Sequence, residues 1–294
     1  MADYVVSCSS SADLTDEYTK ERGIVYVSHT MSLNGTEYLD DMWQSMKPEE
    51  MYQRMIDGEE SKTSQVSVAA YVDHFTKYLE QGKDILHLSL SSGISGTVNA
   101  AMNAKSMLEE KYPDRKIYIV DSLAASSGFG LLVDKIADLK DEGKTIDEAY
   151  QFAEDHKLNL IHWFFSSDLT FYIKGGRVSK TAGFVGNLLN ICPLLNVDYM
   201  GRLIPREKIR TKKKVIKRIV EKMEELADNG HDYDGKVFLS QSACYDDAQA
   251  VVDLIKEKFP KVKEIRIFPI GATIGAHTGP GTVALFFWGK KRED

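Results

Sequence analysis

The segment ILHLSL (residues 85–90) is followed by SSGISG (91–96) and then by a helical pattern over residues 97–111. A short apolar run that ends in small turn residues predicts a buried strand, and the segment after the turn predicts the helix that packs on it. Together they predict one βα unit, which is the repeating piece of a largely parallel sheet.

The neighbouring segments repeat this pattern. Residues 67–81 place their apolar side chains on one helical face, with Ser67 suited to cap the start and Gly82 to stop the end. The first part of the chain is therefore predicted to be an α/β domain with a mostly parallel sheet and flanking helices. Its later elements are a strand at 117–120, a helix from about 126, and a helix opened by a capping box at 145–148.

A new strand begins at residue 160, and we predict a domain boundary there, which gives an N-terminal domain (1–160) and a C-terminal domain (161–294). The second part predicts another α/β layer, and its last strands should form a mixed sheet. Its expected elements are a short apolar helix at 181–191, a hairpin around Gly201, helices at 211–227 and 247–259, and strands at 237–240, 265–270 and 282–288.

The composition places the chain among folded globular proteins. It has 294 residues, 43% hydrophobic and 28% charged, which is enough for two domains with real cores. No stretch approaches the roughly 20 apolar residues of a membrane span, and the first residues lack the pattern of a signal peptide. The three cysteines are scattered and show no metal-site spacing. We therefore expect a cytoplasmic protein without a metal site.

The charge of the chain is distributed unevenly. Residues 174–218 contain twelve Lys and Arg against Asp198 and Glu207, a local charge of +10. Because the whole chain carries −7, the remainder carries −17. The basic segment indicates either an acidic partner or a phosphate, or else an ordinary solvated helix face.

The turn at residues 91–96 is a candidate anion site. It lies between a strand and a helix, where free backbone N–H groups and the helix dipole favour a carboxylate or a phosphate. The alternative is a turn that only connects the two elements. No Gly-Lys-Ser/Thr follows, so the turn is not a P-loop, and Thr97 stands where a nucleophile elbow needs its last glycine.

Residues 271–281, GATIGAHTGPG, are the most unusual segment. Four glycines, a histidine and a proline between two strands predict a loop that is held close to another group. His277 is a candidate functional residue, although a lone histidine can equally serve as a structural hydrogen-bonding group. No second histidine lies at metal-ligand spacing.

Six ordered segments that span essentially the whole chain resemble the DegV family of bacterial proteins. They are TSQ (63–65), SSGISGT (91–97), DS (121–122) with SG (127–128), YIKGGRVS (172–179), LLNICP (188–193) and IGAHTGPGT (274–282).

The resemblance implies two α/β domains that hold one long-chain fatty acid between them, with its carboxylate at the domain interface and its tail in an apolar tunnel. The implied carboxylate ligands are Thr63, Ser95 and His277. The residues that support this site by the same resemblance are Ser92, Gly93, Gly96 and Thr278. Arg177 is implied at the phosphoryl-transfer face, and Arg210 on the surface that meets a partner.

Some members of the family are the fatty-acid-binding subunits of bacterial fatty acid kinase. We therefore expect a lipid-binding subunit that is not an enzyme by itself, takes part in phospholipid metabolism, and has an ATP-binding kinase subunit as partner. The expected ligand is an acid such as palmitate, stearate or oleate, with no other cofactor and no nucleic acid. Transient contact with a membrane surface is compatible with this interpretation.

Two other functions compete with this one. A stand-alone hydrolase or phosphotransferase would use Ser95 with His277 as its base. A regulator that binds nucleic acid would use the stretch from Arg202 to Arg218, which lacks interleaved aromatic residues and any recognised DNA-binding motif. The residues expected to line the tunnel, which could equally be plain core, are Phe184, Val185, Leu188 and Leu189.

Overall fold

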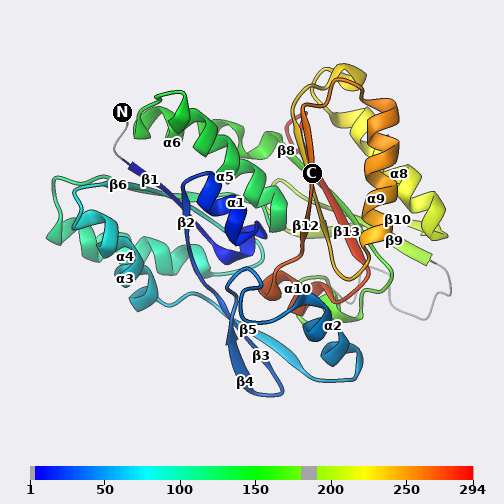
Figure 1. Ribbon diagram of the computed structural model, residues 1–294, viewed down its shortest axis with the longest axis horizontal. Helices are drawn as coiled ribbons and strands as arrows, with labels where there is room; N and C mark the ends of the chain where they lie inside the picture. The colour runs from blue at the N-terminus through cyan, green and yellow to red at the C-terminus, as the bar shows by residue number, and fades with distance from the viewer. Residues whose placement is uncertain (1–3, 180–190, 294) are drawn as a thin grey trace.

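Three β-sheets organise the part of the chain that the structure describes (Figure 1). The computed structural model describes residues 4–179 and 191–293. A four-stranded sheet belongs to the first part of the chain, a six-stranded sheet to the second part, and a small three-stranded sheet projects from the body below them. The predicted α/β fold class is confirmed.

The four-stranded sheet has the order β2-β1-β6-β7, and all its neighbouring strands are parallel. Apolar side chains on its two faces pack against different helices, which is why the strands are almost continuously apolar. Its strands are β1 (Tyr4–Ser9), β2 (Ile24–Val27), β6 (Asp84–Ser89) and β7 (Ile117–Asp121). The surrounding helices are α1 (Asp16–Glu21), α3 (Val68–Leu79), α4 (Thr97–Lys111), α5 (Ser126–Asp141) and α6 (Ile146–His156).

The six-stranded sheet has the order β10-β9-β8-β13-β11-β12 and is mixed, because only β11 and β12 run parallel. Helices α8 (Lys212–Leu226) and α9 (Tyr245–Lys258) cover one face of this sheet (Figure 1). The strands are β8 (Leu160–Ser166), β9 (Ile191–Val197), β10 (Leu203–Arg210), β11 (Lys236–Gln241), β12 (Glu264–Pro269) and β13 (Thr282–Trp288).

Helix α5 lies between the two large sheets. Twelve of its 16 residues are buried, and it packs against β1 on one side and against β8, β11 and β13 on the other. Residues 126–134, the first part of α5, are all buried, whereas the charged residues of the helix lie in its second half. Because α5 precedes residue 160 and yet contacts both sheets, the domain boundary at that residue stays a prediction.

The small sheet was not foreseen from the sequence. It is antiparallel, with the order β4-β3-β5, and it packs with helix α2 around four methionines that also contact α10. Its elements are β3 (Thr30–Leu33), β4 (Thr36–Leu39), β5 (Ser61–Ser64) and α2 (Pro48–Ile56). The four methionines are Met31, Met46, Met51 and Met55.

Several predicted signals are confirmed in detail. Ser67 accepts a hydrogen bond from the N–H of Ala70 at the start of α3, and Thr145 forms the predicted capping box at the start of α6. Strands β9 and β10 form the expected hairpin, in which Gly201 has a φ of +73°.

One predicted element is wrong, and another lies outside the described residues. The prediction of a loop at 271–281 is wrong, because the central part of this segment forms helix α10 (Ala272–Thr278). The short helix expected at 181–191 lies outside the described residues except for its last position, where β9 begins. Phe184, Val185, Leu188 and Leu189 also lie outside the described residues.

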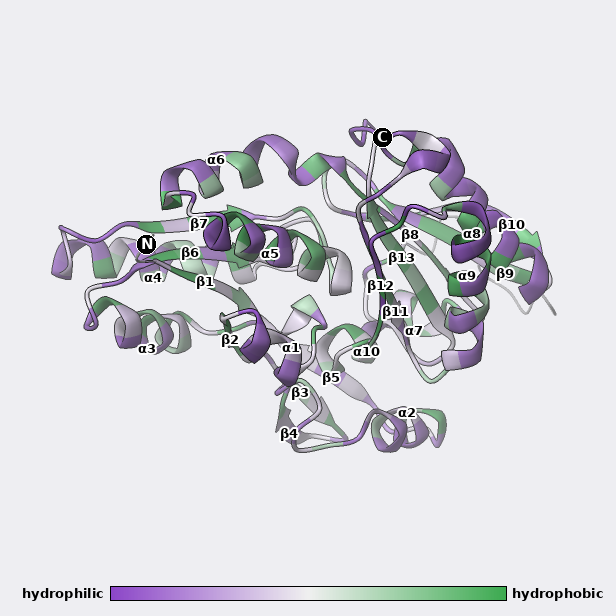
Figure 2. Ribbon diagram, turned by 45° about the horizontal axis from the view of Figure 1, so that its top comes forward, coloured by the Kyte–Doolittle hydropathy of each residue, from purple (hydrophilic) through white to green (hydrophobic). Residues whose placement is uncertain are grey.

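The hydropathy of the elements follows their position (Figure 2). The strands of the two large sheets are rich in apolar residues, and the outer helices show polar residues toward the solvent. Within residues 4–179 and 191–293, no helix has both the length and the apolar character needed to cross a bilayer.

The remaining elements are α7 (Thr170–Lys174) and the 3-10 turns at Ser10–Ala12, Lys157–Asn159 and Gly230–Asp232.

A buried arginine near the end of the chain joins the two parts of the molecule. The guanidinium of Arg292 donates hydrogen bonds to the backbone oxygens of Leu123 at 3.0 Å, Asp198 at 2.8 Å and Lys157 at 3.1 Å. These oxygens belong to the loop after β7, the β9–β10 turn and the segment before β8. Arg292 therefore holds three separate segments in place.

We predict that Arg292→Gln lowers the free energy of unfolding by about 2–4 kcal/mol, because several buried carbonyl groups lose their donor. Lys291→Gln is the matched control, since Lys291 is exposed and its replacement should change stability by less than about 0.5 kcal/mol. Urea unfolding of both variants measures the difference. Equal stabilities would contradict the role assigned to Arg292.

Candidate functional site

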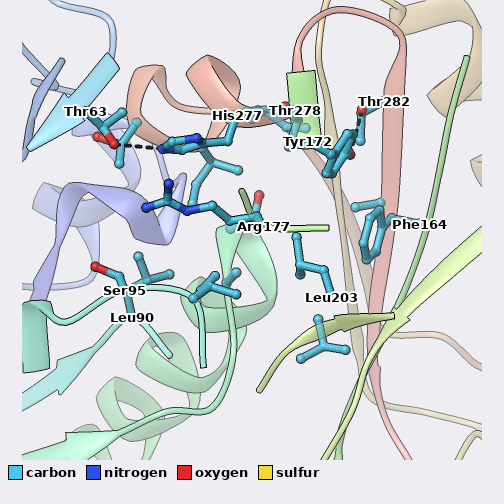
Figure 3. Close-up of a pocket in the computed structure, with 18 of the residues that line it drawn as sticks. Thr63, Leu90, Ser95, Phe164, Tyr172, Arg177, Leu203, His277, Thr278 and Thr282 are labelled. Atoms are coloured by element: carbon cyan, nitrogen blue, oxygen red, sulfur yellow. Dashed lines mark hydrogen bonds between the residues drawn. The ribbon is translucent and has the colours of Figure 1, made fainter. Parts of the chain in front are cut away.

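A cavity of about 190 Å³ lies at the junction of the three sheets. Thr63 of β5 and Ser95 of the 91–96 turn line one side of it, and side chains of β8 and β13 line the other. Figure 3 shows polar groups at one end, around Thr63, His277 and Arg177, and apolar groups such as Phe164 and Leu203 at the other. The cavity therefore has a polar end and an apolar end.

The three residues expected to bind a carboxylate all line this cavity. Thr63, Ser95 and His277 come from distant parts of the sequence and face the same space (Figure 3). Thr63 Oγ1 and His277 Nε2 share a hydrogen bond of 2.7 Å. Thr278, expected as a supporting residue, lines the cavity as well.

Strand β5 brings Thr63 to His277 through simple alternation. Successive side chains of a strand point to opposite faces, so Ser61 and Thr63 share one face. Ser61 Oγ donates to the backbone oxygen of Ala276 at 2.9 Å, and Thr63 reaches the histidine next to it. The small sheet therefore positions one wall of the polar end.

His277 is held as a neutral imidazole. Burial and, to a lesser extent, the nearby positive charge of Arg177 together lower the pKa of His277 to about 4. Its Nδ1 has no hydrogen-bond partner among the described residues and lies against Gly175. A Cβ at position 175 would come within 2.3 Å of Nδ1, so only glycine fits there.

Arg177 is a half-buried cation on the cavity wall. Its Nη1 donates to the backbone oxygen of Gly175 at 2.5 Å, and no acidic side chain in the described ranges forms an ion pair with it. Burial lowers the pKa of Arg177, which reflects the cost of holding this charge away from water. A cation in this situation is suited to an anionic group in the cavity.

The hydroxyl groups around the 91–96 turn have different roles. Ser95 lines the cavity, and its Oγ accepts the N–H of Thr97 at 3.3 Å at the start of α4. Ser91 is buried and donates to the backbone oxygen of Gly201 at 2.8 Å. Thr97 is also buried and bonds to the hydroxyl of Tyr71. Of these residues, only Ser95 faces the cavity.

Ser92, Gly93 and Gly96 do not line the cavity and instead shape the turn. Ser92 and Gly93 are exposed, and the turn packs on the β9–β10 hairpin so closely that a Cβ on Gly93 would lie 2.4 Å from the oxygen of Met200. A Cβ on Gly96 would meet the side chain of Gln65 at 2.7 Å. The supporting role expected for these three residues stays a prediction, and it would act through the shape of the turn.

The geometry does not favour a Ser95–His277 catalytic pair. No hydrogen bond joins the two side chains: Nε2 of His277 is bonded to Thr63, and its Nδ1 faces Gly175. Neither nitrogen is free to take a proton from Ser95 in this arrangement. Within the part of the chain that the structure describes, no cluster of His, Cys, Asp and Glu could hold a metal ion.

Sequence reasoning missed a buried polar layer behind the cavity. Ser126 lines the cavity and donates to the carboxyl group of Asp13, and the N–H of Thr273 donates to Asp40 Oδ2 at 3.1 Å. Burial, and to a lesser extent the charge of Asp40, raises the pKa of Asp13 well above its usual value. These contacts anchor the starts of α5 and α10, and no sequence motif predicts the contacts.

Sequence reasoning also missed the apolar wall of the cavity, although the strand periodicity of β8 and β13 could have indicated it. Residues of β8 and β13 alternate between the cavity and the opposite face of the sheet, as strand periodicity requires. The main apolar residues that line the cavity on these strands are Phe164, Ala284 and Phe286.

Comparison with known proteins identifies relatives over the whole chain. A family model described as an uncharacterised protein of the DegV family matches residues 5–290. A DegV domain-containing protein of Clostridium perfringens is 39% identical over 293 residues, which covers 100% of both chains.

Two solved structures are similar in fold and sequence. A DegV family protein from Thermus thermophilus, described for its fatty acid binding, has a TM-score of 0.86 and 26% identity over 99% of this chain and 100% of its own. The fatty acid kinase B3 protein of Streptococcus pneumoniae, loaded with linoleic acid, has a TM-score of 0.85 and 25% identity over 99% and 100% of the two chains.

The lowered pKa of His277 has a consequence for stability. Between pH 6.5 and about 4 the unfolded chain binds a proton at this residue and the folded chain does not, so stability is lost as the pH falls through this window. We predict that His277→Asn removes up to about 3 kcal/mol of this loss. Other buried histidines, such as His74, have lowered pKa values too, so part of the loss should remain.

The measurement is the free energy of unfolding as a function of pH for the wild type, His277→Asn and the control His156→Asn. His156 is exposed at the end of α6, so its replacement controls for the loss of one histidine at the surface. A His277→Asn profile parallel to that of the wild type would show that this histidine is not held neutral by the fold.

Proposed function

This chain belongs to the DegV family, and on that premise we propose that it binds one long-chain fatty acid in the cavity between its two large sheets. The observation that carries the proposal is Arg177, a cavity-lining cation without an acidic partner among the described residues. Hydroxyl and imidazole groups surround it, and an apolar wall begins beside it. A carboxylate with an alkyl tail matches both ends of this cavity.

At the polar end, the carboxylate would sit among Arg177, Thr63, Ser95 and His277. The arginine supplies the charge, and hydrogen bonds to a charged group contribute roughly 1.5–3 kcal/mol each. The neutral His277 adds no second charge, so its contribution is to orient the head group together with Thr63. We thereby assign Arg177 to the head-group site as well as to the phosphoryl-transfer face.

At the apolar end, burial of the tail would supply most of the affinity. About 14 methylenes at ~0.8 kcal/mol each give ~11 kcal/mol before the cost of association is subtracted. The wall of Phe164, Leu203, Ala284 and Phe286 offers no charged group to such a chain. The division of labour is therefore tail burial for affinity and polar contacts for placement.

We further propose that a separate ATP-binding kinase subunit phosphorylates the bound acid in the cytoplasm. The Streptococcus pneumoniae protein of similar fold is a fatty acid kinase component, and His277 and Ser95 of this chain are not arranged as a catalytic pair. The basic segment would supply the surface for this partner. Ion pairs with Asp198, Glu207 and Asp247 neutralise part of it, whereas Arg210, Lys213 and Lys214 are exposed cations without an ion pair in the described ranges.

The fatty-acid proposal predicts about one equivalent of long-chain fatty acid in protein purified from a bacterial host, or taken up by delipidated protein. Arg177→Met should weaken binding of the acid about 10- to 100-fold, because a charge-assisted hydrogen bond is lost. Binding of the primary alcohol of equal chain length should not change. Mass spectrometry of the extracted lipid and titration with both ligands measure these effects.

Lys174→Met is the matched control, since Lys174 is an exposed cation three residues away that does not line the cavity. Its affinity for the acid should equal that of the wild type. A protein that neither carries nor takes up a fatty acid would refute the proposal, and equal losses for acid and alcohol would refute the assignment of Arg177.

For the kinase partnership, we predict that Arg210→Glu leaves the fatty-acid content unchanged and lowers acyl phosphate formation about tenfold at limiting kinase subunit. The reversed charge slows encounter with an acidic partner surface, so the defect should shrink as the partner concentration rises. Lys111→Glu, at the far end of α4, is the control and should behave like the wild type. Loss of bound lipid in Arg210→Glu would remove this residue from the docking surface.

A further inference from the structure

On the cavity face of the six-stranded sheet, cross-strand pairs of side chains form three successive rows. Strands β8 and β13 are antiparallel neighbours, and their register pairs Ser166 with Thr282, Phe164 with Ala284, and His162 with Phe286. The rows are two residues apart, so the first and third are separated by about 13 Å along the strands.

The first row lies at the polar end of the cavity. Tyr172 OH and Thr282 Oγ1 share a hydrogen bond of 3.0 Å beside Thr278, and Figure 3 shows Phe164 farther along the strand. The middle row leaves room because Ala284 is small. An acyl chain whose head lies near His277 would therefore pass Ala284 and reach the third row.

The third row closes the cavity against α5. His162 and Phe286 are in edge-to-face contact, with ring centroids 5.1 Å apart. A Cβ on Gly128 of α5 would lie 2.3 Å from His162 Nε2 and 2.5 Å from a ring carbon of Phe286. Helix and sheet touch at this level, and no alkyl chain fits between them. His162 Nδ1 donates to the backbone oxygen of Leu160 at 3.1 Å, which fixes the ring.

We propose that Phe286, with His162 and Gly128, sets the longest acyl chain that the cavity accepts. This inference rests on the proposed fatty-acid binding and adds the structural determinant of chain length. Of these three residues, Phe286 is the one to substitute in order to change the length of the cavity. His162 also borders a second hollow, which is lined by Lys222, Lys290 and Lys291, so its removal would open the apolar end toward charges.

Strand β13 offers a matched pair of substitutions. Phe286 and Phe287 are both buried, but they face opposite sides of the sheet, and only Phe286 lines the cavity. Phe286→Leu lengthens the cavity, whereas Phe287→Leu removes the same atoms from the core under α8 and α9. Thermal unfolding of both variants shows whether each is folded under the conditions of the binding experiment.

The delipidated proteins are offered an equimolar mixture of saturated C12 to C20 acids, and the bound acids are quantified by mass spectrometry. In Phe286→Leu the ratio of bound C20 to bound C16 acid should rise at least about fourfold, the gain for one additional buried methylene. Phe287→Leu should keep the wild-type ratio. Ala284→Val, which narrows the middle row, should shift the distribution toward shorter acids, and its control Ala248→Val in the core beneath α9 should not.

These outcomes separate the inference from the proposed function. A wild type that takes up acids while Phe286→Leu keeps its length distribution overturns the inference and leaves the proposed function standing. An equal shift in Phe286→Leu and Phe287→Leu also overturns it, because general loosening of the core would then explain the change. A wild type that takes up none of the acids overturns both.

Discussion

The contact of α5 with both large sheets is the constraint on which the site depends. At Gly128 the helix touches His162 and Phe286 of the six-stranded sheet, and at Gly130 a Cβ would lie 2.6 Å from the oxygen of Ala12, in the 3-10 turn that follows β1. Glycines at these two positions let the helix pack tightly against the six-stranded sheet and against this turn. At the start of this helix, where Ala125 and Ser126 line the cavity, the packing leaves space. The cavity therefore begins next to the close contact at Gly128.

The charges around the cavity decide which kind of ligand it can hold. Arg177 is half-buried on the cavity wall, and Asp13 is buried behind Ser126. Burial raises the pKa of Asp13 well above its usual value, which favours the neutral carboxyl form, whereas an arginine stays charged even where burial lowers its pKa. Arg177 therefore places a positive charge on the cavity wall, and no acidic side chain in the described ranges forms an ion pair with it. An anion with an apolar body resolves this imbalance and fills the space at the same time.

The sequence predicted the local elements better than the way they assemble. The helix that Ser67 caps, the capping box at Thr145 and the Gly201 hairpin are local signals, and all three are confirmed. The small sheet at 30–64 was missed because its strands have four residues each and two of them are largely exposed, which leaves little apolar periodicity to read. Thr63, Ser95 and His277 were brought together only by family resemblance, since their meeting depends on tertiary contacts that no local pattern encodes.

The segment 271–281 was predicted as a loop but contains helix α10, and this difference shows what the glycines of the segment contribute. Glycine is a poor helix former, and four glycines in eleven residues predicted a loop. In α10, however, a Cβ on Gly275 would lie 2.5 Å from the hydroxyl of Tyr52, so this glycine admits a close contact. The same contact holds α10 against α2, while Ser61 ties its last turn to β5. His277 is therefore carried by a short helix fixed on two sides, and the head-group role proposed for it would need such a rigid support more than a flexible loop.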